Sequence, residues 1–203
     1  MRALVFAVLV LGATVMASSA LASGIADAWT GTNWGESPEA VQRHFGARGF
    51  ALPQPLDFGD SYAPIALRDL SVSGYPMIVY YQFDKVTHAL KRIQLELPRH
   101  RVNAGAFRGV FLALDADYGA PDVSCGTLPG PTTAYQGTAE YVWSRGGVVI
   151  RAIFRDTTLQ AWGGCYSPAC GLTAQLLLRV SPPAEDRAVC PPLPTGAQLR
   201  QRP

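Results

Sequence analysis

The chain has 203 residues, with 17 Lys and Arg against 15 Asp and Glu, and its formal net charge is only +2. So small a charge argues against an electrostatically driven complex with nucleic acid, which depends on many phosphate contacts by basic side chains. After removal of an N-terminal leader, enough residues remain for one large domain, or two small and closely packed halves, around a real core.

The N-terminus has the organisation of a secretory signal peptide. Arg2 precedes the apolar residues 3–16, and Ala20-Leu21-Ala22 supplies an A-x-A cleavage site. The apolar stretch is shorter than the ~20 residues of a membrane-spanning helix, although an uncleaved anchor is the alternative. We therefore predict that residues 1–22 are removed and that the protein is periplasmic or secreted, without a stable membrane span.

Four cysteines follow the leader: Cys125, Cys165, Cys170 and Cys190. An even number of cysteines in an exported chain favours two disulfides. A redox pair and a zinc site are the alternatives, but the chain has no C-x-x-C motif and no histidine close in sequence to the cysteines. Of the three possible pairings we prefer Cys165–Cys170, which closes a local loop, together with Cys125–Cys190, which ties down the tail.

The first predicted helix begins after Ser37. Ser37 can accept a hydrogen bond from the first turn, Pro38 has a backbone φ suited to the first helical position, and Gly46 lets the chain leave the helix. Its residues expected to face the core are Ala40, Val41, His44 and Phe45.

After a loop over residues 52–64, the apolar residues alternate as they do in strands. The pattern is irregular around 65–73 and clear over 78–83 and 88–97, with a turn near 84–87 that makes the last two segments an antiparallel hairpin.

The same order then recurs. Asn103 can cap a helix that ends at Gly119, and strands are predicted over 139–145, 148–155 and 172–180. Gly146-Gly147 is typical of a hairpin turn between the first two of these strands. Residues 182–203 are rich in proline and are expected to be extended or disordered.

We therefore predict an α+β fold, in which tandem α-β-β-β units form an antiparallel sheet with the helices packed on one face. Residues 23–181 would form a single domain of two similar halves, about 30–98 and 102–181, followed by the Pro-rich tail 182–203.

The segments WGESPEAVQRHFG and YYQFDKVTHALKRIQLEL, and a later helix that ends in DYGAPD, resemble small bacterial envelope proteins of the double-wing type. These include the small-protein-A type outer-membrane assembly lipoproteins and the β-lactamase-inhibitory proteins. The matching residues are Trp34, Gly35 and Ser37, then Phe83, Asp84 and Leu90. The resemblance implies a protein that binds other proteins, often through a sheet face, and that has no known catalytic residues.

This chain departs from that pattern in two ways. It has no cysteine at the cleavage site to carry a lipid anchor, and the loop from Cys165 to Cys170 matches no motif of the group. The resemblance assigns no binding residue by position, and likeness of fold alone is weak evidence for function.

Candidate catalytic groups are few. Ser37 and His44 lie two helical turns apart, at about 10 Å, too far for a direct hydrogen bond. His88 is expected at a hairpin tip as a solvated imidazole, and His100 lies between two arginines in the connection between the halves. We predict no catalytic residue, no metal site and no cofactor.

The alternation of the strands divides the sheet into two faces. The predicted core face holds Val79, Tyr81, Phe83, Ile93, Leu95, Leu97, Val148, Ile150, Phe154, Leu176, Leu178 and Val180. The opposite face holds Tyr80, Gln82, Arg92, Gln94, Glu96, Tyr141, Trp143, Arg151, Arg155, Gln175 and Arg179. Tyr, Trp and Arg are enriched in binding hot spots, but an ordinary exposed sheet face is the alternative.

The sequence therefore favours an exported, non-catalytic binding protein of the bacterial cell envelope. Its partner would be another envelope protein or an envelope component, bound on the face that holds the arginines and aromatic residues. The alternative is a small periplasmic hydrolase or ligand-binding enzyme whose site combines distant residues, such as His44 or His88 with an acid. The sequence carries no signal for an oligomeric state.

Overall fold

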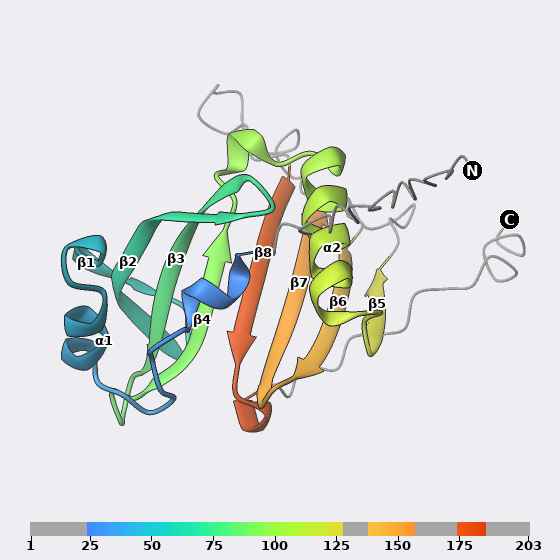
Figure 1. Ribbon diagram of the computed structural model, residues 1–203. Helices are drawn as coiled ribbons and strands as arrows, with labels where there is room; N and C mark the ends of the chain where they lie inside the picture. The colour runs from blue at the N-terminus through green and yellow to red at the C-terminus, as the bar shows by residue number, and fades with distance from the viewer. Residues whose placement is uncertain (1–23, 128–137, 157–173, 186–203) are drawn as a thin grey trace, which may run out of the picture.

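The computed structural model describes residues 24–127, 138–156 and 174–185, which form one eight-stranded antiparallel sheet with helices (Figure 1). In chain order the elements are η1 (Ile25–Ala28), α1 (Pro38–Phe45), η2 (Gly46–Arg48), β1 (Phe50–Asp57), β2 (Ser61–Val72), β3 (Tyr75–Asp84), β4 (Leu90–Glu96), η3 (Arg99–Arg101), α2 (Ala104–Tyr118), β5 (Val123–Thr127), β6 (Thr138–Arg145), β7 (Val148–Asp156), β8 (Ala174–Ser181) and η5 (Pro183–Glu185), where η marks a 3-10 helix.

Both α-helices begin and end where the sequence predicts. The Ser37 side chain accepts a hydrogen bond from the Ala40 N–H at 3.4 Å, and Gly46 ends α1. The Asn103 side chain accepts from the Ala106 N–H at 2.9 Å, before α2. These caps satisfy backbone donors that the first turn of a helix leaves without a partner.

One side chain of α1 is oriented differently from the prediction. Val41 and Phe45 are buried, but His44 is exposed, and its Nε2 lies 2.9 Å from the Thr30 carbonyl oxygen. The helix therefore contributes a narrower apolar stripe to the core than expected.

The strand order in the sheet is β1-β2-β3-β4-β8-β7-β6-β5. Strands β1 to β4 form one meander and β5 to β8 another, and the two meanders meet where β4 pairs with β8. The α+β class and the antiparallel sheet are as predicted, but each α-helix is followed by four strands and not by three.

The additional strands, β1 and β5, occupy segments for which the sequence predicts no strand. Both lie at the edges of the sheet, where a strand pairs on one side only. Pro53 and Pro55 are tolerated in β1 because an edge strand does not need every backbone N–H for pairing. A proline-rich segment therefore forms a strand here.

The Gly146-Gly147 turn fixes the register of β6 on β7. Both glycines have positive φ, 57° and 80°, as a two-residue hairpin turn requires. Arg145 pairs with Val148 directly across this turn. The pairs farther from the turn, as far as Thr138 with Arg155, follow from this one.

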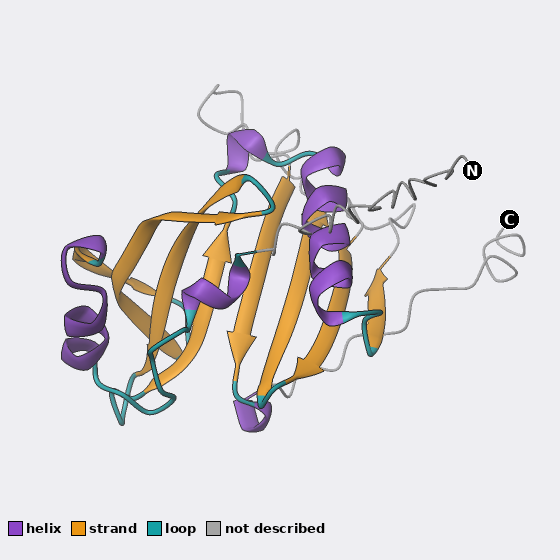
Figure 2. Ribbon diagram, in the orientation of Figure 1, coloured by secondary structure: helices purple, strands orange, loops and turns teal. Residues whose placement is uncertain are grey.

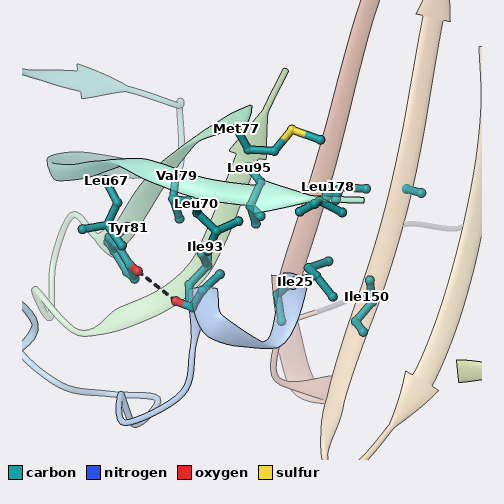
Figure 3. Packing of buried hydrophobic residues seen from close by; sticks show 14 of the residues in the cluster. Ile25, Leu67, Leu70, Met77, Val79, Tyr81, Ile93, Leu95, Ile150 and Leu178 are labelled. Atoms are coloured by element: carbon teal, nitrogen blue, oxygen red, sulfur yellow. Dashed lines mark hydrogen bonds between the residues drawn. The ribbon is translucent and has the colours of Figure 1, made fainter. Parts of the chain in front are cut away.

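Helices η1 and α2 lie over one face of the sheet, α1 lies beside β1 and β2, and η3 and η5 lie at the ends of the strands (Figure 2). In Figure 1, η1 crosses the region where β4 meets β8, and α2 lies over β6 and β7. Ile25 of η1 points toward Leu178 and Ile150 (Figure 3). At the other end of the sheet, Phe45 of α1 packs on Tyr81, with 5.0 Å between ring centroids.

The core is the face predicted from the sequence. All predicted core residues except Phe154 belong to a single hydrophobic cluster. The Phe154 ring packs against Phe107 of α2, with 5.0 Å between ring centroids. Tyr81 is the main polar exception, because its buried hydroxyl donates a hydrogen bond to the Ala28 carbonyl at 2.8 Å. This bond attaches η1 to the sheet, and burial raises the pKa of Tyr81 well above its ordinary value.

Several predictions fall outside the described residues. They are the signal peptide, Cys165, Cys170, Cys190 and most of the tail. Cys125 is fully buried on β5, and both disulfide pairings stay predictions. Within the described ranges, no helix is long and apolar enough to cross a membrane.

We predict that Tyr81→Phe lowers the free energy of unfolding by about 1–2 kcal/mol, because the Ala28 carbonyl loses its buried donor while the ring packing is kept. Urea denaturation followed by circular dichroism measures this. Tyr62→Phe is the control, since the Tyr62 hydroxyl bonds the exposed His88 and its loss should cost less. Equal losses in the two variants would show that the Tyr81 hydroxyl does not hold η1.

Candidate functional site

The candidate site is the sheet face opposite the helices, which is called the polar face below. Its residues are Tyr80, Gln82, Arg92, Gln94, Glu96, Glu140, Arg151, Arg155, Gln175 and Arg179. Strand pairing fixes their positions: Tyr80 lies opposite Gln94, Gln94 opposite Arg179, and Arg179 opposite Arg151. One straight row of side chains thus crosses β3, β4, β8 and β7.

Tyr141 and Trp143 do not belong to this face, and the prediction that placed them there is wrong. The Tyr141 ring packs on Phe111 of α2 at 4.6 Å between centroids. Trp143 is fully buried, and its Nε1 donates a hydrogen bond to the Gly119 carbonyl at 2.7 Å.

The physical reason is the register that the Gly146-Gly147 turn sets. Trp143 lies opposite Ile150 and therefore points to the same side of the sheet as this core residue. Directly paired residues share a face, so the alternation of β6 follows that of β7. The predicted two-residue turn already implies which residues of β6 and β7 lie opposite each other, and this register places both aromatic residues on the core face.

The same register brings to the polar face a residue that was not predicted there. Glu140 of β6 forms an ion pair with Arg151 of β7, with 2.8 Å between Oε2 and Nη1. The Arg151 side chain is only 6% exposed, so this carboxylate offsets the cost of burying a guanidinium.

Burial on the polar face is uneven. Gln82, Gln94 and Arg151 are buried, whereas Tyr80, Arg92, Glu96, Glu140, Arg155, Gln175 and Arg179 are half-buried. Between them lie the buried aliphatic residues Val142, Val149, Ile153 and Leu177. The loop between β1 and β2 reaches the border of the face, where Phe58 lies 6.1 Å from the Tyr80 ring.

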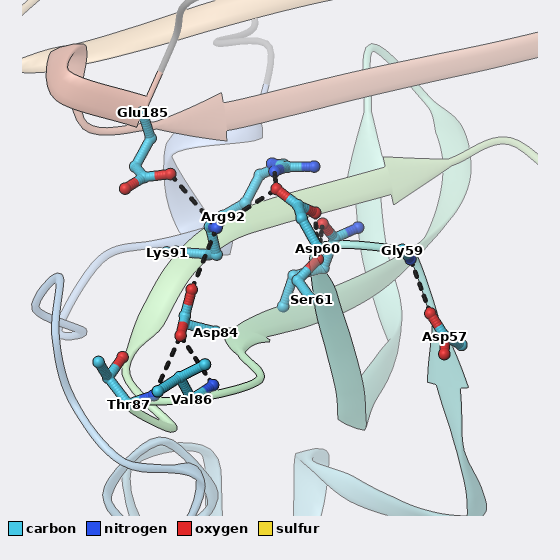
Figure 4. Close-up of polar contacts among 11 residues, drawn as sticks. Asp57, Gly59, Asp60, Ser61, Asp84, Val86, Thr87, Lys91, Arg92 and Glu185 are labelled. Carbon is cyan, nitrogen blue, oxygen red and sulfur yellow. Dashed lines mark hydrogen bonds and ion pairs between the residues drawn. The ribbon is translucent and has the colours of Figure 1, made fainter.

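Hydrogen bonds connect the polar groups of the central strands. Arg179 Nε donates to Gln94 Oε1 at 3.0 Å, and Gln94 Nε2 donates to Glu96 Oε1 at 2.6 Å. Toward the β3 side, Arg92 Nη2 lies 2.8 Å from Oδ2 of Asp60 (Figure 4). These bonds restrict the rotamers of the side chains before any partner arrives.

The positive charge of the face is only partly compensated. Arg92 and Arg151 have carboxylate partners, but Arg179 bonds the neutral Gln94, and no ion pair or hydrogen bond joins the Arg155 guanidinium to another described residue. Burial lowers the pKa of Arg179, and repulsion from Arg92, Arg155 and Arg151 lowers it further, against a smaller opposing effect of Glu140. An anionic group is therefore electrostatically favoured here.

Among the residues that the structure describes, no acid is hydrogen-bonded to the histidines that could serve an enzyme. His44 contacts a backbone carbonyl, and His88 Nδ1 lies 2.8 Å from the Tyr62 hydroxyl at a positive φ of 55°. Ser37 is occupied as a helix cap. In the ranges that the structure describes, no three His, Cys, Asp or Glu residues are grouped so that they could hold a metal ion.

A second polar region lies at the end of the β3–β4 hairpin. Lys91 Nζ contacts carboxylates of Asp60 and Asp84, each at 3.3 Å, and of Glu185 at 3.5 Å (Figure 4). Beside it is a groove of about 430 Å³, lined by Trp34, Gly35, Asp84, Thr87, Ala89, Leu90, Lys91, Pro182 and Glu185. This cluster attaches η5 to the hairpin.

No family model, no curated protein and no solved structure matches this chain. The resemblance to the double-wing envelope proteins therefore stays a prediction from sequence.

We predict that Trp143→Ala lowers the free energy of unfolding by about 3–5 kcal/mol, as expected when a large buried aromatic side chain is removed from a core. Leu112→Ala, on the exposed side of α2, is the matched control and should change it little. Urea denaturation of both variants measures these changes. If Trp143 pointed to solvent, its replacement would lower the free energy of unfolding as little as that of Leu112.

A second prediction concerns Asp84 and pH. Hydrogen bonds from the Thr87 and Val86 N–H groups, with a smaller effect of Lys91, lower the pKa of Asp84 to about 2 from 3.8. The charged carboxylate thus stabilises the fold at pH values above 3.8, and this contribution disappears as the pH falls toward 2.

Asp84→Asn should therefore lower the melting temperature at neutral pH, and the difference from the unsubstituted protein should shrink between pH 4 and pH 2. Thermal unfolding across this range measures it. Asp115→Asn on α2, outside the cluster, is the control. A difference that does not change with pH would rule out the charge of Asp84 as its cause.

Proposed function

We propose that this protein is an exported, non-catalytic binding protein of the bacterial cell envelope that engages another protein through the polar face. The observation that carries the proposal is that two half-buried guanidinium groups of this face, those of Arg155 and Arg179, have no carboxylate partner among the described residues. Export is expected from the signal peptide, and the partner is expected to carry acidic side chains.

Arginine suits this role for a physical reason. Its planar guanidinium can form two parallel hydrogen bonds to one carboxylate, and it loses less hydration than lysine when it enters an interface. The backbones of Arg155 and Arg179 are fixed in neighbouring central strands, and the hydrogen bond to Gln94 also holds the Arg179 guanidinium before binding. A rigid site pays less conformational entropy on association.

The core positions of Tyr141 and Trp143 alter the kind of recognition that we propose. Tyr80 is the aromatic side chain that the polar face retains, and Arg and Gln side chains surround it. Charge complementarity, more than aromatic anchors, would then select the partner and speed its association.

We also propose that the two halves are copies of one α-β unit. Each has a capped α-helix followed by an antiparallel meander, which supports this view. The polar face would then be a composite, with β3 and β4 from one copy and β7 and β8 from the other.

The alternative function, a small periplasmic hydrolase, has no observation in its favour. It needs an acid beside His44 or His88, and in the described part of the chain these imidazoles contact a carbonyl and a phenol hydroxyl.

Site-specific photo-crosslinking in the periplasm tests the proposal. A photoreactive residue at Gln175, on the polar face, should trap a partner protein, whereas one at Leu112 on α2 should not. Arg155→Glu should abolish the Gln175 crosslink, because an acidic partner would be repelled. Arg108→Glu on α2 is the charge-matched control and should leave the crosslink intact. Crosslinks of equal yield from both faces, or none from either, would reject the polar face as the interface.

A further inference from the structure

Gln82 on β3 is a fully buried residue of the polar face with an incomplete set of hydrogen bonds. Its Oε1 accepts from the Ser61 hydroxyl at 3.2 Å, but its Nε2 has no partner in the described part of the protein. A buried donor without an acceptor is unfavourable and is uncommon in folded proteins. An acceptor from outside the chain would satisfy these N–H groups, and it reaches them only when a neighbouring side chain such as Arg92 moves aside, because Nε2 is closed to solvent in the free protein.

Two guanidinium groups lie on the same part of the face. Arg92 is the direct cross-strand partner of Gln82, and Arg179 lies on the next strand, opposite Gln94. Arg92 is also the strongest source of repulsion on Arg179. Asp60 engages Arg92 through Nη2, and Gln94 engages Arg179 through Nε. Because a guanidinium has five N–H donors, each retains further donors for a ligand.

We propose that Gln82, Arg92 and Arg179 form a carboxylate-binding subsite, and that an acidic side chain of the protein partner occupies it. The subsite rests on the proposed function, because it names the chemistry of the partner at the polar face. The Gln82 amide and the two guanidinium groups donate to the oxygens of the partner's carboxylate.

The charge and the geometry favour a carboxylate over a phosphate group. Arg92 and Arg179 carry two positive charges. Asp60 compensates one of them, because Lys91, which Asp60 also contacts, has Asp84 and Glu185 as further partners. The remaining single charge matches one carboxylate, whereas a phosphate monoester brings a charge closer to −2. Asp60 itself shows that a carboxylate can approach Arg92 at 2.8 Å.

Titration of the mature protein with an oligoglutamate peptide, followed by NMR chemical shifts, tests the subsite. The peptide should shift resonances of β3, β4 and β8, and Arg179→Gln should weaken binding by at least about tenfold, the usual effect of losing a charge-assisted hydrogen bond. Arg108→Gln, on the helix-covered side, should leave binding unchanged.

Gln82→Met is the more specific variant, because methionine has nearly the same shape and lacks the amide. It should weaken peptide binding without lowering the melting temperature, since the amide donor that it removes is unsatisfied in the free protein and Ser61 keeps its bond to Asp60. A lower melting temperature with unchanged peptide binding would mean that Gln82 has a structural role only, and would overturn the subsite.

Two further probes separate the source of the anion. Inorganic phosphate and phosphatidylglycerol vesicles should bind more weakly than the peptide, and tighter binding of either that depends on Arg179 would overturn the carboxylate assignment. The proposed function can fail independently of the subsite. Peptide binding without any crosslinked partner would contradict the proposed function and leave the subsite standing. If a partner is crosslinked and its capture survives both Arg179→Gln and Gln82→Met, the proposed function stands and the subsite is contradicted.

Discussion

The pairing of β4 with β8 is the constraint on which the rest of the structure depends. It joins two four-stranded meanders into one sheet, and it does so in a single register that places Leu95 opposite Leu178 and Gln94 opposite Arg179. A shift by one residue would exchange the faces of a whole meander and bring charges under the helices. The apolar pair instead lies beneath η1, whose Ile25 covers the junction. Core and polar face are thus defined by the same four pairs of residues.

The polar face destabilises the fold, because it holds charged groups in positions that are poorly hydrated. Arg151 is offset by the ion pair with Glu140, which is the usual condition for a buried guanidinium. Arg179 lies directly opposite Arg151, an arrangement of like charges that disfavours folding. Its bond to Gln94 supplies an acceptor but no compensating charge. This local excess arises although the whole chain is nearly neutral, so net charge gives no indication of it.

What the sequence predicts well is what short-range physics determines. The helix caps, the hairpin from β3 to β4 and the core residues of the central strands depend on near neighbours, and they lie as expected. Edge strand β1 was missed because its prolines are typical of a loop, and only its place at the border of the sheet makes them tolerable. Most predicted residues of the polar face lie on it, whereas Trp143 does not, because alternation alone does not say which side of β6 faces the core. Glu140 follows from the predicted turn, since the register of β6 on β7 places it opposite Ile153, whereas Asp60 reaches Arg92 from a loop whose position sequence spacing does not reveal.

The position of Arg179 at the junction has a consequence for any function of the polar face. Its acceptor Gln94 and the neighbouring Arg92 come from β4, whereas Arg151 and Arg155 come from β7, beyond the junction. The group of charges around Arg179 therefore exists only when the two meanders are joined, and neither meander alone carries it. A binding surface built there would be a property of the complete sheet. Selection for binding and selection for correct pairing of β4 with β8 would then act on the same residues, so loss of the pairing would remove the site even in a chain whose separate meanders still formed.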